Sequence, residues 1–154
     1  MKLLVISDVH GRRDRVEQAL AQQTDCATVL FLGDGLREVE DVADNHPERS
    51  FVMVPGNCDF SALLPATRLE IWGGKRVMMT HGHRYHAKHG LTTLYLAAQE
   101  RQADILLFGH THQPLQLYED GLYILNPGSL GYEGTYGLLE ITSAGIMTNV
   151  VRLT

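Results

Sequence analysis

The sequence has few cysteines, no basic excess and no long apolar run. Its two cysteines, Cys26 and Cys58, form no Cys-x-x-Cys pair, which argues against a disulfide framework and a thiolate zinc site. A formal charge of −5 argues against binding a nucleic acid polymer, which requires a basic face. No stretch approaches a membrane span or signal-peptide core. We therefore expect a cytoplasmic protein without a membrane partner, and a compact phosphorylated substrate stays possible because it needs only local positive charge.

Short apolar runs alternate with helical spacing in the first half of the chain. With 44% hydrophobic residues, residues 1–154 can bury the core of one single domain. Runs at 3–6, 28–32 and 51–54 predict buried strands. Apolar residues at helical spacing predict helices over 12–22 and, more briefly, over 36–43. This alternation is typical of right-handed parallel crossovers.

The second half contains pairs of apolar runs separated by turn residues, a pattern that predicts antiparallel hairpins. The pairs are 68–72 with 75–80, 115–118 with 122–125, and 136–142 with 146–153. Between them we expect a histidine-rich loop at 81–90, a helix near 91–98 and a buried strand at 105–108. The sequence has no internal repeat or linker, so it predicts one α/β domain of mixed sheets covered by helices.

Potential metal ligands follow five of the apolar runs within about two residues. They are Asp8 with His10, Asp34, Asn57, His81, and His110 with His112. In crossover sheets the carboxyl ends of the strands share one rim, where the loops converge on a ligand. Imidazole, carboxylate and amide donors without a thiolate suit borderline transition ions better than an all-oxygen calcium or magnesium cage. Each residue alone could be a helix cap, a turn former or a core histidine, but together they predict a metal site.

These blocks resemble a known signature. In order along the chain, they are Asp8-x-His10, Gly33-Asp34, Gly56-Asn57, His81 and Gly109-His110-x-His112. This order is similar to that of the calcineurin-like metallophosphoesterases and covers nearly the whole chain. The short length, Gly56-Asn57-Cys58-Asp59 and Asn126-Pro127-Gly128-Ser129 resemble the YfcE-like small phosphodiesterases. The resemblance implies an α/β fold with two mixed β-sheets packed face to face and helices outside.

The resemblance also implies two divalent transition metal ions. Asp8, His10, Asp34 and His112 would hold the first ion, and Asp34, Asn57, His81 and His110 the second, so that Asp34 is shared. We expect manganese, with nickel, zinc, iron and cobalt as alternatives. Two ions roughly 3.5 to 4 Å apart lower the pKa of a water between them and hold a phosphoryl group. A bridging hydroxide would then hydrolyse a phosphodiester without a serine or cysteine nucleophile.

The predicted catalytic residues are Asn57, Cys58 and His83. Cys58 stands where many relatives carry a histidine that assists the leaving group, and a thiol donates weakly. We therefore predict weak monoesterase activity and a preference for diesters, although Cys58 could equally be a small buried residue that fills a gap. His83 follows His81 by two residues and could donate to the substrate or leaving group.

Six other polar residues have open roles. The sequence favours solvent-facing loop positions for His46, His86 and His89. Arg12 is predicted as an exposed residue at a helix start, with a phosphate contact as the alternative. Asn126 and Ser129 could line the rim of the site or simply form a turn.

Two rival functions remain beside the phosphodiesterase. One is a phosphomonoesterase or nucleotide phosphatase on the same metals. The other is a non-catalytic scaffold similar to the retromer subunit, which keeps the fold but has altered a metal-ligand position. Because all ligand positions here carry competent donors, we expect an enzyme with a small phosphoester substrate, and a homo-oligomer is compatible with it.

Overall fold

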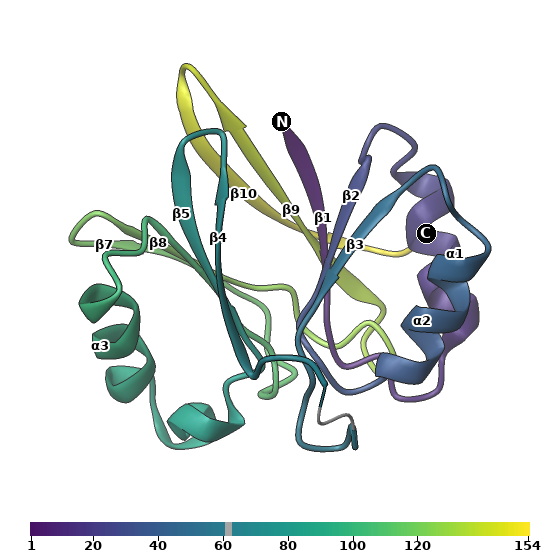
Figure 1. The fold of residues 1–154 in the computed structure, drawn as a ribbon, viewed down its shortest axis with the longest axis horizontal. Helices are drawn as coiled ribbons and strands as arrows, with labels where there is room; N and C mark the ends of the chain where they lie inside the picture. Colours follow the sequence, from purple (N-terminus) through teal and green to yellow (C-terminus); the bar gives the residue numbers. More distant parts are fainter. Residues whose placement is uncertain (61–62) are drawn as a thin grey trace.

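The computed structural model describes residues 1–60 and 63–154. In these ranges the chain forms two five-stranded mixed sheets that face each other, as Figure 1 shows. Two helices, α1 and α2, cover the outer face of one sheet, and α3 covers the outer face of the other. The predicted fold, two mixed sheets packed face to face with helices outside, is confirmed.

The first sheet has the strand order β10-β9-β1-β2-β3. Its strands are β1 (Lys2–Ile6), β2 (Thr28–Phe31), β3 (Ser50–Met53), β9 (Thr135–Thr142) and β10 (Gly145–Arg152), and its helices are α1 (Arg13–Gln22) and α2 (Leu36–Asp44). The strands β1, β2 and β3 are parallel, as the alternation of strands and helices predicts. The last hairpin, β9 with β10, joins the sheet along the other side of β1 in antiparallel fashion.

The second sheet has the strand order β4-β5-β6-β8-β7. Its strands are β4 (Thr67–Trp72), β5 (Lys75–Thr80), β6 (Ile105–Leu107), β7 (Leu115–Glu119) and β8 (Leu122–Asn126), and its helix is α3 (Thr92–Glu100). The predicted hairpins β4 with β5 and β7 with β8 are present. In the centre of the sheet, however, β5, β6 and β8 run parallel. The expected loop at 81–90 contains two short 3₁₀ helices, η1 (His83–Tyr85) and η2 (Ala87–His89).

The continuous apolar run of β1 is explained by burial on both of its faces. Leu4 and Ile6 pack in the core shared with α1 and α2, whereas Leu3 and Val5 pack in the core between the two sheets. Each such fully buried side chain contributes about 1.5–3 kcal/mol relative to exposure.

Among the described residues, no helix combines the length and the apolar character needed to cross a membrane.

The two sheets place the carboxyl ends of their parallel strands at one end of the molecule. In Figure 1 this end is at the bottom, where the loops after β1, β2, β3, β5 and β6 lie near one another. Every predicted metal ligand belongs to one of these loops. The topology therefore brings together segments far apart in the chain, since His10 and His112 are separated by 102 positions.

Candidate metal centre

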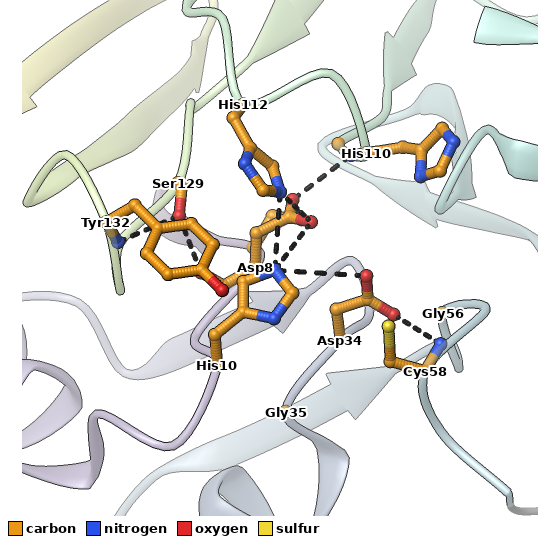
Figure 2. Close-up of polar contacts among 12 residues, drawn as sticks. Asp8, His10, Asp34, Gly35, Gly56, Cys58, His110, His112, Ser129 and Tyr132 are labelled. Carbon is orange, nitrogen blue, oxygen red and sulfur yellow. Dashed lines mark hydrogen bonds and ion pairs between the residues drawn. The ribbon is translucent and has the colours of Figure 1, made fainter. Parts of the chain in front are cut away.

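The first group of predicted ligands comes from the loops after β1 and β6. The Oδ1 atom of Asp8 lies 3.2 Å from Nε2 of His112 and 3.6 Å from Nε2 of His10. The two histidine Nε2 atoms lie 3.2 Å apart. Figure 2 shows the three side chains pointing at one another. They form a group of donors whose spacing could hold one metal ion.

The second group, formed by Asp34, His81 and His110, adjoins the first. The Oδ2 atom of Asp34 lies 3.3 Å from Nε2 of His81, and the rings of His81 and His110 are 5.0 Å apart. The same Oδ2 atom lies 3.9 Å from Nε2 of His10 in the first group. Asp34 therefore faces both groups, in the position expected for a shared ligand.

Two buried atoms in the centre have no hydrogen-bond partner within the part of the chain that the structure describes. They are Oδ1 of Asp8 and Nε2 of His81. The other polar atom of each side chain does have a partner. Asp8 Oδ2 accepts hydrogen bonds from the Ser7 hydroxyl and the His110 amide. His81 Nδ1 lies 2.7 Å from the Leu32 carbonyl oxygen. Buried polar atoms are normally satisfied. The unpaired atoms thus fit a cation, and the donor types suit a divalent transition ion.

The electrostatics of the centre favour a bound cation. Burial acts to raise the pKa of the Asp34 carboxyl, but His81 and the Cys58 amide outweigh it and hold that pKa well below its usual range. Burial acts to lower the pKa of His81, but the carboxylates of Asp34 and Asp8 raise it above its usual value. The carboxylates that favour a proton on His81 favour a metal ion in its place. Burial, followed by the charge of His81, lowers the pKa of His110 to about 4, which keeps this imidazole neutral and able to bind metal.

Most of the ligand residues have a left-handed backbone. Positive φ angles occur at Asp8 (55°), His10 (46°), Asp34 (63°), His110 (69°) and His112 (62°). Residues other than glycine rarely adopt this conformation, which costs energy and is concentrated at functional sites. Hydrogen bonds between loops hold it, since the amide of Asp8 donates to Gly33 and the amide of Gly109 donates to His81.

Gly56 and Gly109 are required because neighbouring side chains approach their Cα atoms closely, and not because the chain turns there. A Cβ atom on Gly56 would lie 2.1 Å from Oδ1 of Asp34, and one on Gly109 would lie 2.0 Å from the hydroxyl oxygen of Ser7. Both distances are far below van der Waals contact. Any side chain at these positions would displace Asp34, a predicted metal ligand, or Ser7, which holds Asp8.

Asp59 is a structural residue of the site that the sequence interpretation missed. Its carboxylate accepts hydrogen bonds from the amides of Asp34 (2.8 Å), Gly35 (3.0 Å), Leu36 (3.0 Å) and Gly56 (2.9 Å). It therefore caps the start of α2 and ties it to the loop after β3. The sequence signal was an aspartate in the Gly-Asn-Cys-Asp segment. A capping residue normally directly precedes its helix, whereas Asp59 follows α2 in the chain.

The loop after β8 supplies a further missed residue, Tyr132. Its ring stacks on His10 with centroids 4.7 Å apart and planes 18° apart, and it lies 5.2 Å from the ring of His112 (Figure 2). Ser129 fixes this loop, because its hydroxyl donates to the Asp8 carbonyl and accepts from the Tyr132 amide. The Tyr132 ring thus contacts both histidines of the first group, while the residue as a whole remains exposed to solvent.

Asn126 and Ser129 do not line the rim, so that alternative is wrong. Both are fully buried. The Asn126 amide donates to the Gly109 carbonyl (3.1 Å) and to the Thr111 hydroxyl (3.0 Å). These residues hold the loops that carry Asp8 and His110, because buried polar groups need internal partners.

Of the three predicted catalytic residues, Cys58 and His83 contact the second group, through Asp34 and His81. Asn57 is exposed, with its amide nitrogen 3.7 Å from the Cys58 sulfur. Cys58 is also exposed, so the gap-filling alternative is wrong. Burial, followed by the charge of Asp34, raises the pKa of the Cys58 thiol. His83 is half-buried with its ring 5.4 Å from that of His81, and burial lowers its pKa.

The remaining predicted residues lie away from the two groups. His86 and His89 are exposed, as expected. Arg12 is an exposed residue before α1 whose guanidinium pairs with Asp14 at 3.0 and 2.9 Å. His46 lies in a loop, as expected, but its side chain is half-buried and contacts the carboxylates of Glu17 (2.8 Å) and Glu48 (3.0 Å).

Two facing mixed sheets with adjoining aspartate and histidine groups at their strand ends define a class of metal-binding hydrolases. The chain belongs to the calcineurin-like phosphoesterase superfamily, whose domain model matches residues 1–144. It is accordingly a phosphoric ester hydrolase. The superfamily resemblance found in the sequence is confirmed.

Individual relatives agree with this membership. The chain is 33% identical to the probable metallophosphoesterase YsnB of Bacillus subtilis strain 168 over 131 residues, which cover 84% of this chain and 75% of that protein. It is 28% identical to phosphodiesterase YfcE of Escherichia coli K12 over 169 aligned positions, covering 91% and 88%. A crystal structure of a predicted phosphoesterase from Streptococcus pneumoniae TIGR4 superposes with a TM-score of 0.83 at 28% identity, covering 98% of this chain and 88% of that one. These similarities support the YfcE-like family.

Proposed function

We propose that the protein is a phosphodiesterase with a binuclear divalent metal centre. The observation that carries the proposal is the pair of adjoining donor groups, in which one oxygen of Asp34 lies within 4 Å of a histidine from each group. Asp8 Oδ1 and His81 Nε2, which are buried and have no hydrogen-bond partner among the described residues, support it. The similarity to a protein named phosphodiesterase YfcE supports the choice of substrate class.

In this proposal Asp8, His10 and His112 hold the first ion, His81, His110 and Asn57 hold the second, and Asp34 binds both. Manganese is the expected metal, and nickel, zinc, iron or cobalt would accept the same donors. When bound, two such ions supply a water or bridging hydroxide of lowered pKa and neutralise charge on the phosphoryl group. The two carboxylates offset only half of the metal charge, so the site attracts an anion without a basic patch.

Protein groups at the edge of the centre would contact the remainder of the substrate. The Cys58 thiol stays protonated at neutral pH because its pKa is raised, and it donates only weakly. His83 is neutral because its pKa is lowered, and it can donate one hydrogen bond. Neither group strongly stabilises a poor leaving group, which favours diesters with good leaving groups over monoesters.

The expected substrate is a small phosphoester. Two rival functions must be distinguished from the phosphodiesterase. A phosphomonoesterase would use the same metal ligands on a doubly charged substrate. A scaffold of the retromer-subunit kind would bind metal without turnover. The complete set of aspartate and histidine donors favours an enzyme over the scaffold.

The test combines metal analysis with rates on matched esters. The protein is stripped with a chelator, reloaded with manganese, nickel or zinc, and assayed on bis(4-nitrophenyl) phosphate and 4-nitrophenyl phosphate. We expect two ions per chain and faster hydrolysis of the diester. Faster monoester hydrolysis would favour the phosphatase, and two ions without turnover would favour the scaffold.

A further inference from the structure

A cavity of about 590 Å³ opens directly beside the metal centre. His10, Asp34 and Cys58 form the side next to the metal ligands. Residues at the start of α2, together with Phe60 and Leu63, form the other side. Pockets for small ligands are typically about 300 to 1,000 Å³, so this one has room for an organic group attached to a phosphate held at the centre.

The lip of the cavity is apolar and exposed. Phe60 and Leu63 are 99% and 94% exposed, although both are large hydrophobic residues. Leu36, at the start of α2, adds a buried apolar side chain to the same wall. Clustered apolar side chains at a cavity mouth gain favourable free energy when a ligand covers them. The cavity therefore suits a ligand with an apolar face.

The charged side chains of the cavity wall disfavour a second anionic group away from the metal centre. The amides at the start of α2 would normally attract an anion, but the carboxylate of Asp59 already accepts from those of Gly35 and Leu36. The remaining charged side chains in the wall are Arg37, Glu38 and Glu40. With two carboxylates against one guanidinium, the wall repels a further phosphate or carboxylate.

We propose that this cavity binds one ester arm of the substrate, and that the arm is an uncharged organic group of aryl or nucleoside size. The proposal rests on the proposed function, because the metal centre must hold the phosphate to which the arm is attached. It narrows the substrate class to diesters with at least one large arm that carries no negative charge. It also assigns Phe60, Glu38 and Glu40 to substrate selection.

Binding of symmetrical diesters to the metal-loaded protein tests the proposal, because either arm can then enter the cavity. The probes are dimethyl, diphenyl and bis(4-carboxyphenyl) phosphate, each measured by calorimetry. We expect diphenyl phosphate to bind at least about tenfold more tightly than dimethyl phosphate, as expected when roughly 1.4 kcal/mol of apolar contact is added. Bis(4-carboxyphenyl) phosphate should bind more weakly than diphenyl phosphate.

Two substitutions locate the effect in the cavity. Phe60→Ala should reduce the advantage of diphenyl over dimethyl phosphate by about threefold to tenfold. A Glu38→Gln, Glu40→Gln double variant should selectively strengthen binding of the carboxyphenyl diester. These residues are at the surface, so folding should be preserved. Leu96→Ala, an exposed leucine on α3, is the matched control and should change none of the ratios.

The outcomes separate the two proposals. Equal affinity for the three diesters, or a Phe60→Ala variant that behaves as wild type, would overturn the assignment of the cavity even if diesters are hydrolysed. If the affinity series holds but no diester is hydrolysed with any metal, the proposed function fails and the arm-binding cavity stands.

Discussion

Oδ1 of Asp8 and Nε2 of His81 lie 3.8 Å apart in the floor of the site, on side chains with no solvent exposure. Neither atom has a hydrogen-bond partner among the described residues. Asp8 belongs to the first donor group and His81 to the second, so this short distance means that the two groups adjoin. Buried polar atoms without a hydrogen-bond partner reduce stability, and a cation between the loops would offset that cost.

Metal binding should therefore stabilise the fold. At a free metal concentration of about 100 times Kd, binding adds about 2.7 kcal/mol to the free energy of unfolding. For a chain of this size we expect Tm to rise by roughly 5 to 10 °C. Calorimetry of chelator-stripped protein with and without manganese measures this, and an unchanged Tm would contradict the metal site.

Asp34→Asn should weaken both metal sites together. The amide oxygen can still accept from Cys58, as Asp34 Oδ1 does now at 2.8 Å, but the substitution removes the charge that faces both groups. His10→Ala should instead lower the occupancy of mainly one site. Elemental analysis after dialysis distinguishes the two patterns, and two tightly bound ions in Asp34→Asn would disprove the shared role.

Tyr132 should orient the histidines of the first metal group through ring contact. Tyr132→Ala should weaken metal binding by about tenfold, the lower range for substitutions that support metal ligands. Tyr132→Phe keeps the stacked ring and should restore wild-type affinity. Calorimetric titration with manganese compares the variants, and equal losses in both would assign the effect to the hydroxyl instead.

Asp59 should contribute to stability independently of metal. Asp59→Ala leaves four backbone amides without their carboxylate acceptor, and we expect a loss of about 2 to 4 kcal/mol from the cap and buried hydrogen bonds. Urea denaturation of chelator-treated protein measures the loss. Asp14→Ala, which removes an exposed carboxylate, should change stability by less than about 0.5 kcal/mol.

His46 should make stability depend on pH. Hydrogen bonds with Glu48 and Glu17 raise its pKa in the folded state above the usual value of about 6.5. The stabilisation is therefore fully present below about pH 6.5 and is lost as pH rises through the folded pKa. Wild type should exceed His46→Gln in Tm at pH 5.5, with the difference shrinking by pH 8.5, whereas a constant difference would show that protonation is not involved.

Local patterns in the sequence predicted most of the secondary structure and the candidate metal ligands. Apolar runs and turn residues predicted the strands, because those signals depend on neighbouring residues. Donors such as Asp34 and His81 could be assigned because each directly follows a strand, and the rim of a crossover sheet gathers such positions.

Only the tertiary structure decided how the centre is supported and what lies beside it. Asp59 caps a helix that precedes it, Ser129 bonds to Asp8 over 121 positions of the chain, and Tyr132 reaches His10 from the loop after β8. The parallel pairing of β5, β6 and β8 and the cavity at Phe60 likewise depend on packing between distant segments. Such contacts arise from chain topology and shape complementarity, which have no local signal in the sequence.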